Sequence, residues 1–245
     1  MTRRFLPFLF VIGWGIFLIG VAPARAAEPA DFEAAVDGAY RSYRTALFYA
    51  HTGNTDLAAI ELRQAQDTWS DIQGKYLATP PAAYAKDPHW GDDLEAVAQK
   101  LADTVALLDA GKGKEAEAAG RSIADTLSNL RKRNGRAGYS DCVLDLTRQM
   151  DVLFRWRHQP PVLTDQAQAN KIMAQALGYR AQLLRCRALA PKEYAGTPDF
   201  ARIYDGANKS VSSLPPAIER KDPHAVVNIL RELISFDRIL FFKLG

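Results

Sequence analysis

The sequence predicts an all-α protein, built as a tandem duplication of an up-down-up-down four-helix bundle. Three observations lead to this prediction. From about residue 30 onward, apolar residues recur at steps of three and four, the period of an amphipathic helix. Short turns that contain Gly or Pro separate these segments. The order of helices and loops in the first half then recurs in the second half. No segment shows a strand pattern of comparable strength.

Residues 1–26 have the features of a signal peptide that is removed on export. Arg3 and Arg4 precede the almost wholly apolar stretch Phe5–Ala22, and residues 24–26, Ala-Arg-Ala, match the small-residue cleavage signal. A membrane anchor needs a similar apolar length, so a single N-terminal span is the alternative. The cleavage signal favours export, and we expect the mature chain to be soluble in the periplasm of a Gram-negative bacterium.

The mature chain is expected to be electrically balanced. Removing Arg3, Arg4 and Arg25 from the 31 basic residues leaves 28, against 28 acidic residues. This balance gives no indication of a nucleic-acid partner or of an anionic membrane surface. No further apolar run approaches the length of a transmembrane helix.

Eight main helices are expected, four in each half. Gly, Asn, Asp and Pro mark their ends, as in Thr52-Gly53-Asn54-Thr55, where Thr55 or Asp56 would cap the second helix. In the same way, Asp222-Pro223 supplies an N-cap and a first helical residue. The expected segments are Asp31–His51, Leu57–Leu77, a helix capped by Asp92 or Asp93 that runs through Leu108, Glu115–Arg133, Asp141–His158, a helix capped by Thr164 or Asp165 that runs through Leu189, Asp199–Leu214 and Asp222–Leu244.

The boundary between the halves lies where Asn134-Gly135 and Gly138 end the fourth helix. We therefore expect a cleaved signal peptide over 1–26, a first four-helix unit over 27–138 and a second over 139–245. Short turns favour antiparallel neighbours in each unit. Each unit is expected to fold around its own apolar core.

The proposed duplication depends on matched residues at fixed offsets. Apolar positions of the first, third and fourth helices recur 106 residues later, and those of the second helix recur 112 later. A loop motif, Pro-x-x-Tyr-Ala, also recurs at 81–85 and 191–195, and no helical period forces that match. The apolar pairs are Leu47 with Leu153, Leu94 with Phe200, Val97 with Ile203, Val105 with Val211, Ile123 with Ile229, Leu127 with Leu233, and, at 112, Ile60 with Ile172, Ile72 with Leu184 and Leu77 with Leu189.

The two cysteines, Cys142 and Cys186, predict a disulfide. In an oxidising compartment, the first interpretation of two cysteines in one chain is a disulfide bond. Cys142 opens the fifth helix and Cys186 closes the sixth, so an antiparallel hairpin brings them within the roughly 7 Å between Cα atoms that a disulfide needs. Neither residue belongs to a C-x-x-C or C-x-x-C-H motif.

The histidines offer a metal-site hypothesis. His158 and His224 would lie at the same end of the second unit, with Asp222 nearby, and these side chains are the low-priority metal candidates. Capped helix termini with exposed imidazoles are the alternative, because His224 follows an Asp-Pro helix start and His89 occurs in a matching Lys-Asp-Pro-His sequence. No H-x-x-x-H or E-x-x-H pair supports the metal.

Other catalytic or binding patterns are weak. The basic group Arg131, Lys132, Arg133 and Arg136 suggests an anion site, but basic residues also favour the last turn of a helix. There is no G-x-S-x-G setting and no Gly-rich phosphate loop. The acids Glu61, Asp145 and Asp237 fall close to apolar stripes and are interpreted as boundary residues. We therefore predict no catalytic residues.

The architecture over residues 30–245 resembles the exported four-helix bundles of the cytochrome c′ and cytochrome b562 class. Such a resemblance implies a haem protein. A cytochrome c′ would carry Cys-x-x-Cys-His near the end of the last helix, where this chain has Ser-Phe-Asp-Arg-Ile at 235–239. A b562-type pair of haem ligands would need Met on the first helix and His on the last. In this chain Met150 is on a first helix, but the last helix has His224 only at its start.

These observations lead to a non-enzymatic binding or scaffolding protein of the periplasm, with no cofactor predicted. Its partner would be another periplasmic protein or a small ligand, and the sequence does not identify it. A haem or metal carrier of the c′/b562 type is the alternative. The candidate surfaces are the groove between the units and the two Pro-x-x-Tyr-Ala loops, with Tyr84, Trp90, Trp156 and Tyr194 as contact residues.

Overall fold

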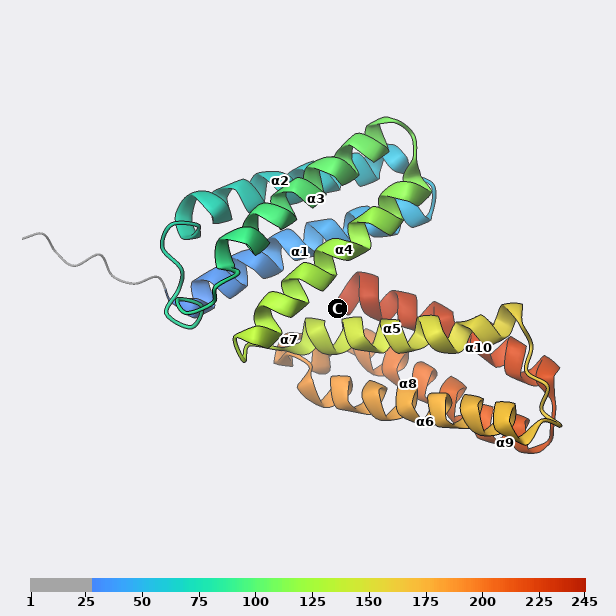
Figure 1. The fold of residues 1–245 in the computed structure, drawn as a ribbon. Coiled ribbons are helices and arrows are strands. Elements are labelled where there is room, and N and C mark those ends of the chain that lie inside the picture. Colours follow the sequence, from blue (N-terminus) through green and yellow to red (C-terminus); the bar gives the residue numbers. More distant parts are fainter. Residues whose placement is uncertain (1–27) are drawn as a thin grey trace, which may run out of the picture.

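A computed structural model describes residues 28–245, and its elements are all helical (Figure 1). The signal peptide predicted at 1–26 lies outside the described residues. Within 28–245 there is no strand, as the sequence predicted, and none of the helices there combines the length and apolarity needed to cross a bilayer. The elements are α1 (Pro29–His51), α2 (Thr55–Tyr76), α3 (Trp90–Asp109), α4 (Gly113–Arg133), α5 (Tyr139–His158), α6 (Gln166–Leu189), α7 (Lys192–Ala195), α8 (Pro198–Ser212), α9 (Leu214–Glu219), α10 (Pro223–Ile239) and the π-helical turn η1 (Leu240–Leu244).

Four helices, α2, α6, α8 and α10, begin at a residue whose side chain caps the first turn. The Asn54 side chain accepts a hydrogen bond from the Leu57 amide at 3.2 Å, so α2 is capped one residue earlier than predicted. Asp222 caps α10 by accepting from the Ala225 amide at 2.9 Å, with Pro223 as the first helical residue, as predicted. The Pro215-Pro216 pair follows Leu214, the predicted end of the seventh helix, and lies in the first turn of α9, where a missing proline amide leaves no helical hydrogen bond unmade.

The helices form two sets. In the first set, α1–α4, helix α1 contacts α2 and α4, and α3 contacts the same two helices. In the second set, α5–α10 with η1, helix α5 contacts α6 and α10, and α8 contacts the same two. Figure 1 shows the sets side by side, with α4 leading into α5 and the C-terminal end of the chain lying between them.

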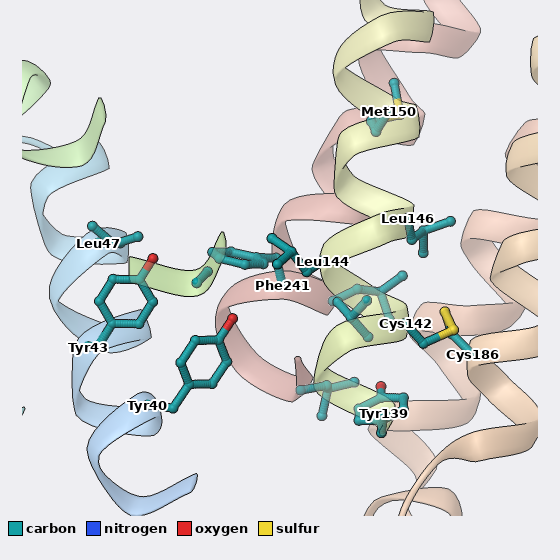
Figure 2. Close-up of a cluster of buried hydrophobic side chains, with 14 of the residues drawn as sticks. Tyr40, Tyr43, Leu47, Tyr139, Cys142, Leu144, Leu146, Met150, Cys186 and Phe241 are labelled. Carbon is teal, nitrogen blue, oxygen red and sulfur yellow. A yellow bond between two sulfur atoms is a disulfide. The ribbon is translucent and has the colours of Figure 1, made fainter. Parts of the chain in front are cut away.

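The buried apolar side chains form one continuous cluster across both sets, which corrects the expectation of two separate cores. The connection runs through η1, which contacts both α1 and α5. Figure 2 shows Leu144 and Phe241 between α5 and the Tyr40 side of α1. Because these two side chains are 7% exposed each, the junction is itself part of the core. The apolar turn at the end of the chain therefore contributes buried side chains to a core that both sets share.

Burial supports one of the two predicted alignments between the halves and contradicts the other. At the offset of 106, the core residues of α3 match those of α8: Leu94, Val97 and Leu101 with Phe200, Ile203 and Ala207, all at most 2% exposed. At the offset of 112, Ile60 is 60% exposed whereas Ile172 is fully buried, and Ile72 is buried whereas Leu184 is 43% exposed. The 112 alignment of α2 with α6 is therefore wrong, because similar residue types there occupy opposite faces.

Cys142 and Cys186 lie at disulfide distance, as the sequence predicted. Their sulfur atoms are 2.13 Å apart and their Cα atoms 5.4 Å apart. Cys142 begins the buried face of α5, and Cys186 lies in the last turn of α6, so the antiparallel hairpin joins the two ends. Both side chains are buried. The bridge thus fastens the α5–α6 pair beside the junction of the two sets.

Replacing both cysteines with serine should destabilise the protein. The bridge closes a segment of 44 residues, for which loop entropy predicts a contribution of roughly 4 kcal/mol to the free energy of unfolding. Urea unfolding of C142S/C186S, compared with the oxidised parent, measures the loss. Equal midpoints for the two proteins would show that the bridge does not constrain the unfolded chain.

Candidate functional site

The turn from α4 to α5 is held by a buried ion pair. Arg131 donates two hydrogen bonds to the Asp141 carboxylate, Nε to Oδ2 and Nη2 to Oδ1, each at 2.9 Å. Asp141 Oδ2 also accepts from the Gly138 amide at 2.9 Å, which fixes the start of α5. Asp141 is 2% exposed and Arg131 is 9% exposed. Burial opposes the charge of Arg131, but the hydrogen bonds and charge of Asp141 outweigh it and raise the pKa of the guanidinium.

A second buried arginine, Arg44, links α1 to the end of the chain. Its Nη1 donates to the carbonyl oxygen of Phe241 at 3.0 Å and to that of Phe242 at 3.4 Å. Carbonyl groups in the last turn of a helix carry partial negative charge, so a cation is stabilised there. Burial is the main influence on this group and lowers the pKa of Arg44. The positive charge of Arg44, on α1, therefore complements the partial negative charge at the C-terminal end of the second helix set.

Tyr40 lies between the two arginines. The guanidinium carbon of Arg44 is 5.3 Å from the centroid of the Tyr40 ring, and that of Arg131 is 5.9 Å from it. Both distances suit a cation–π interaction. Burial raises the pKa of Tyr40 to about 12, so its phenol is neutral at physiological pH. An aromatic face thus separates two buried positive charges.

These residues line a polar cavity of about 230 Å³ at the meeting point of α1, the α4–α5 turn, α7 and the chain end. We call it the junction pocket. Its wall contains four basic and four acidic side chains together with three tyrosines. These are Arg41, Arg44, Arg131, Arg136, Glu33, Asp37, Asp141, Glu193, Tyr40, Tyr139 and Tyr194.

Two of the four acids are already neutralised by the pocket's own arginines. Arg131 holds Asp141, and Arg136 forms a bidentate pair with Glu33 at 2.5 and 2.7 Å. The hydrogen bond from Arg136 is the main reason that the pKa of Glu33 is lowered. Asp37 and Glu193 are exposed and form no ion pair or side-chain hydrogen bond within residues 28–245. They remain available as acceptors.

Arg44 also keeps an unused donor. Within the described residues its Nη2 has no hydrogen-bond partner, and this atom is not among the fully enclosed polar atoms, which include its Nε. Arg44 lines the pocket, which makes Nη2 its candidate donor to a ligand there. The junction pocket therefore holds unpaired groups of both signs.

The predicted basic cluster is largely paired with acids. Arg131 binds Asp141, Lys132 binds Asp145 at 2.8 Å, and Arg133 binds Asp87 and Asp93. Most of these side chains therefore join α4 to neighbouring segments, where the sequence had suggested simple helix-end complementarity. Arg131 is the member of the cluster that both lines the junction pocket and is buried.

The candidate metal residues are not brought together. His158 is the last residue of α5 and His224 the second residue of α10, while Asp222 is engaged as the α10 cap. In the part of the chain that the structure describes, no group of three or more His, Cys, Asp or Glu side chains could hold a metal ion. The haem or metal carrier stays a prediction that no observation on these residues favours.

The aromatic residues proposed as a surface divide into two kinds. Tyr84 and Trp90 are 0% and 4% exposed and pack against Phe32 at ring distances of 5.2 and 4.9 Å, so they belong to the core of the first set. This corrects the prediction that they line a binding surface. Tyr194 is half-buried and does line the junction pocket. Trp156 is half-buried and donates to Gln175 at 2.7 Å.

Asp237 on α10 is buried, which corrects its interpretation as a boundary residue. It is 1% exposed, and its carboxyl oxygens accept hydrogen bonds from Thr147 and Tyr179, both at 3.0 Å. Burial raises the pKa of Asp237 to about 7. The signal was present in the sequence, because Asp237 follows Leu230 and Leu233 on the buried stripe of α10.

No protein-family model, curated protein or solved structure matches the chain. Function is therefore inferred from the chemistry of the junction pocket.

Replacing Arg131 with Met should destabilise the fold by about 3–5 kcal/mol, because Asp141 would remain buried without its cation. The matched control is Arg63→Met, whose ion pair with Asp109 is about half exposed on both sides and should contribute less than about 1 kcal/mol. Chemical denaturation measures both losses. Similar losses in the free energy of unfolding for the two variants would show that the buried Arg131–Asp141 pair contributes no more to stability than an exposed pair.

Asp237 should make stability depend on pH. An unfolded Asp has a pKa of about 3.9, whereas the folded value is about 7. Between these values the folded state binds more protons, so the free energy of unfolding falls as pH rises. Asp237→Asn removes this titration and should gain about 3 kcal/mol relative to the parent between pH 5 and pH 8.

Denaturation curves of both proteins at a series of pH values test this expectation. Asp109→Asn changes a half-exposed carboxyl and is the control, expected to leave the pH profile of the parent intact. A parent and D237N whose stabilities run parallel from pH 5 to pH 8 would show that Asp237 has an ordinary pKa.

Proposed function

We propose that this chain is an exported, non-enzymatic binding protein that holds a small zwitterionic ligand in the junction pocket. One observation carries the proposal: an arginine whose Nη2 has no partner and two carboxylates without protein partners belong to residues that line the same cavity. Polar groups in a cavity that have no protein partner are available to a ligand that can pair with them. A ligand with one anionic and one cationic group would do so.

The chemistry of the wall suggests how such a ligand is oriented. Its carboxylate would accept from Nη2 of Arg44, and its ammonium group would lie toward Asp37 or Glu193. The Tyr40 and Tyr194 rings would cover its apolar part. A cavity of about 230 Å³ lies below the roughly 300–1,000 Å³ that drug-sized ligands occupy. An amino acid or a short peptide is the class that fits.

The scaffold that we propose is a pair of tandem four-helix units derived from one ancestor. The ring of contacts among α1–α4 has a counterpart among α5, α6, α8 and α10. The matching burial of α3 and α8 at an offset of 106 supports a common origin. A pocket can form between two such units without an additional loop, because the ends of their helices form its walls.

The periplasm is the proposed location. The apolar stretch and Ala-Arg-Ala signal within residues 1–26 are typical of exported proteins. Cys142 and Cys186, at disulfide distance, are typical of an oxidising compartment. A pocket for amino acids or short peptides suits a compartment in which such molecules arrive from outside the cell.

Calorimetric titration with glycylglycine and two matched analogues tests the proposal. N-acetylglycine lacks the ammonium group and glycinamide lacks the carboxylate. Glycylglycine should bind at least about tenfold more tightly than either analogue, because each analogue leaves one charged group of the pocket unpaired. Equal weak heats for all three compounds would remove the proposed zwitterion site.

Asp37→Asn supplies the decisive variant, because Asp37 is exposed and forms no ion pair or side-chain hydrogen bond within residues 28–245. This change should weaken glycylglycine binding about tenfold and leave the melting temperature of the free protein unchanged. Asp67→Asn, on the exposed face of α2, is the control. Binding that is identical in all three proteins would contradict the assignment of Asp37.

A further inference from the structure

The outer face of α6 carries an apolar stripe that no other element within residues 28–245 covers. Five residues on this face are exposed and follow one another at alternating steps of three and four. Leu177 is 51% and Leu184 is 43% exposed, large fractions for leucine in a helix that is already anchored by its other face. The stripe, which we call the α6 seam, consists of Ala174, Leu177, Ala181, Leu184 and Ala188.

The seam is separate from the face by which α6 joins the core. That inner face is buried and consists of Ala169, Ile172, Ala176, Tyr179, Leu183 and Cys186. An outer helix of a globular protein normally has a polar face toward water. Helix α2 follows this rule, since Arg63, Asp67 and Asp71 are exposed on it. Helix α6 is apolar on its inner face and also on its outer face. Only the inner face packs against other helices within residues 28–245.

The spacing of the seam is that of a helix–helix contact. Alternating steps of three and four give the heptad repeat of a coiled coil, with alanine at one core position and leucine at the other. Alanine lets a second helix approach closely, and leucine supplies the knobs. The seam spans 15 residues, or about 21 Å of helix.

The charged residues of helix α6 itself are all basic. Helix α6 contains Lys171, Arg180, Arg185 and Arg187 and no acidic residue. Arg187 pairs with Asp205 of α8 at 2.6 Å, and Arg180 donates to the Asn208 side chain at 3.0 Å, so these two flank the seam on the α8 side. Arg185 is exposed. An approaching surface therefore meets apolar residues bordered by positive charge.

We propose that the α6 seam is a docking site for an amphipathic helix of a partner protein whose apolar stripe is flanked by Asp and Glu. Such a helix would cover Leu177 and Leu184 and place its carboxylates against Arg180 and Arg185. A second copy of this chain is disfavoured, because it would bring the same arginines against one another. A bilayer is disfavoured because the flat alanine positions offer little to insert.

A pair of synthetic peptides tests the proposal with the full mature chain. Both are helical peptides of about three heptads, with Ala and Leu at the core positions. One has Glu at the flanking positions and the other has Lys. Fluorescence anisotropy should show binding of the Glu peptide and at least tenfold weaker binding of the Lys peptide. Added salt should weaken the Glu complex.

Variants of seam residues test whether the Glu peptide binds at the α6 seam. Leu177→Gln with Leu184→Gln should weaken binding of the Glu peptide at least tenfold, and R180E/R185E should reverse the preference between the peptides. Ile60→Gln is the matched control, because Ile60 is 60% exposed on α2, away from α6. Each replaced side chain is exposed, so unchanged melting temperatures are expected.

Three results would overturn the proposal. The first is a Glu peptide that fails to bind, or that binds L177Q/L184Q as well as the parent. The second is a dimer in sedimentation velocity that L177Q/L184Q dissociates, which would make a second copy the occupant. The third is seam-dependent binding to vesicles of equal parts phosphatidylglycerol and phosphatidylcholine with no peptide preference, which would make a membrane the occupant.

Discussion

The contact between Arg44 and the last turn of the chain is the constraint on which the junction depends. The carbonyl groups at the end of a helix lack some of their intrahelical partners and carry partial negative charge. Arg44 reaches the carbonyl oxygens of Phe241 and Phe242 from the first helix set. A buried guanidinium is tolerated there because it meets those carbonyls and the face of Tyr40. Without this contact, η1 would present polar groups to an apolar junction.

The junction pocket follows from the same contact. Arg44 uses only Nη1 for the carbonyl groups, so Nη2 is left without a partner within residues 28–245. Arg131 is committed to Asp141 by a bidentate pair and holds the wall in place. The Arg131–Asp141 pair therefore shapes the pocket, whereas Arg44 offers a hydrogen-bond donor. Polar groups that hold two units together thus also define what can lie between them.

The two proposed sites are spatially and chemically distinct. The junction pocket is a cavity of about 230 Å³ that is mixed in charge and suited to a small molecule. The α6 seam is open, apolar and bordered by arginines, and it is suited to a helix. The disulfide ties the inner face of α6 to α5 beside the junction pocket, so one rigid hairpin lies between the two sites. A binding protein that presents a ligand to a partner would need such a connection.

Burial decided several points that residue type alone left open. Tyr84 and Trp90 were expected at a surface, yet they pack around Phe32, because the Pro-x-x-Tyr-Ala loop folds back over the end of α1. Ile60 and Leu184 satisfied an apolar pattern but lie on outer faces. Asp237 fitted the buried stripe of α10 and was discounted because it is an acid. Each error has the same origin, since a helical period locates a stripe but does not say which stripe is covered.

The sequence by itself determined the helical class, most helix ends, the Cys142–Cys186 pairing and the turn between the two halves. These properties are local, because they follow from apolar period, capping residues and the geometry of one hairpin. Only the tertiary structure decided that the two cores merge, that Arg44 meets the end of the chain and that Asp37, Arg44 and Glu193 share a cavity. These residues come from segments far apart in the chain, and no local pattern fixes the distance between them. Long-range packing sets that distance, and the candidate function depends on it.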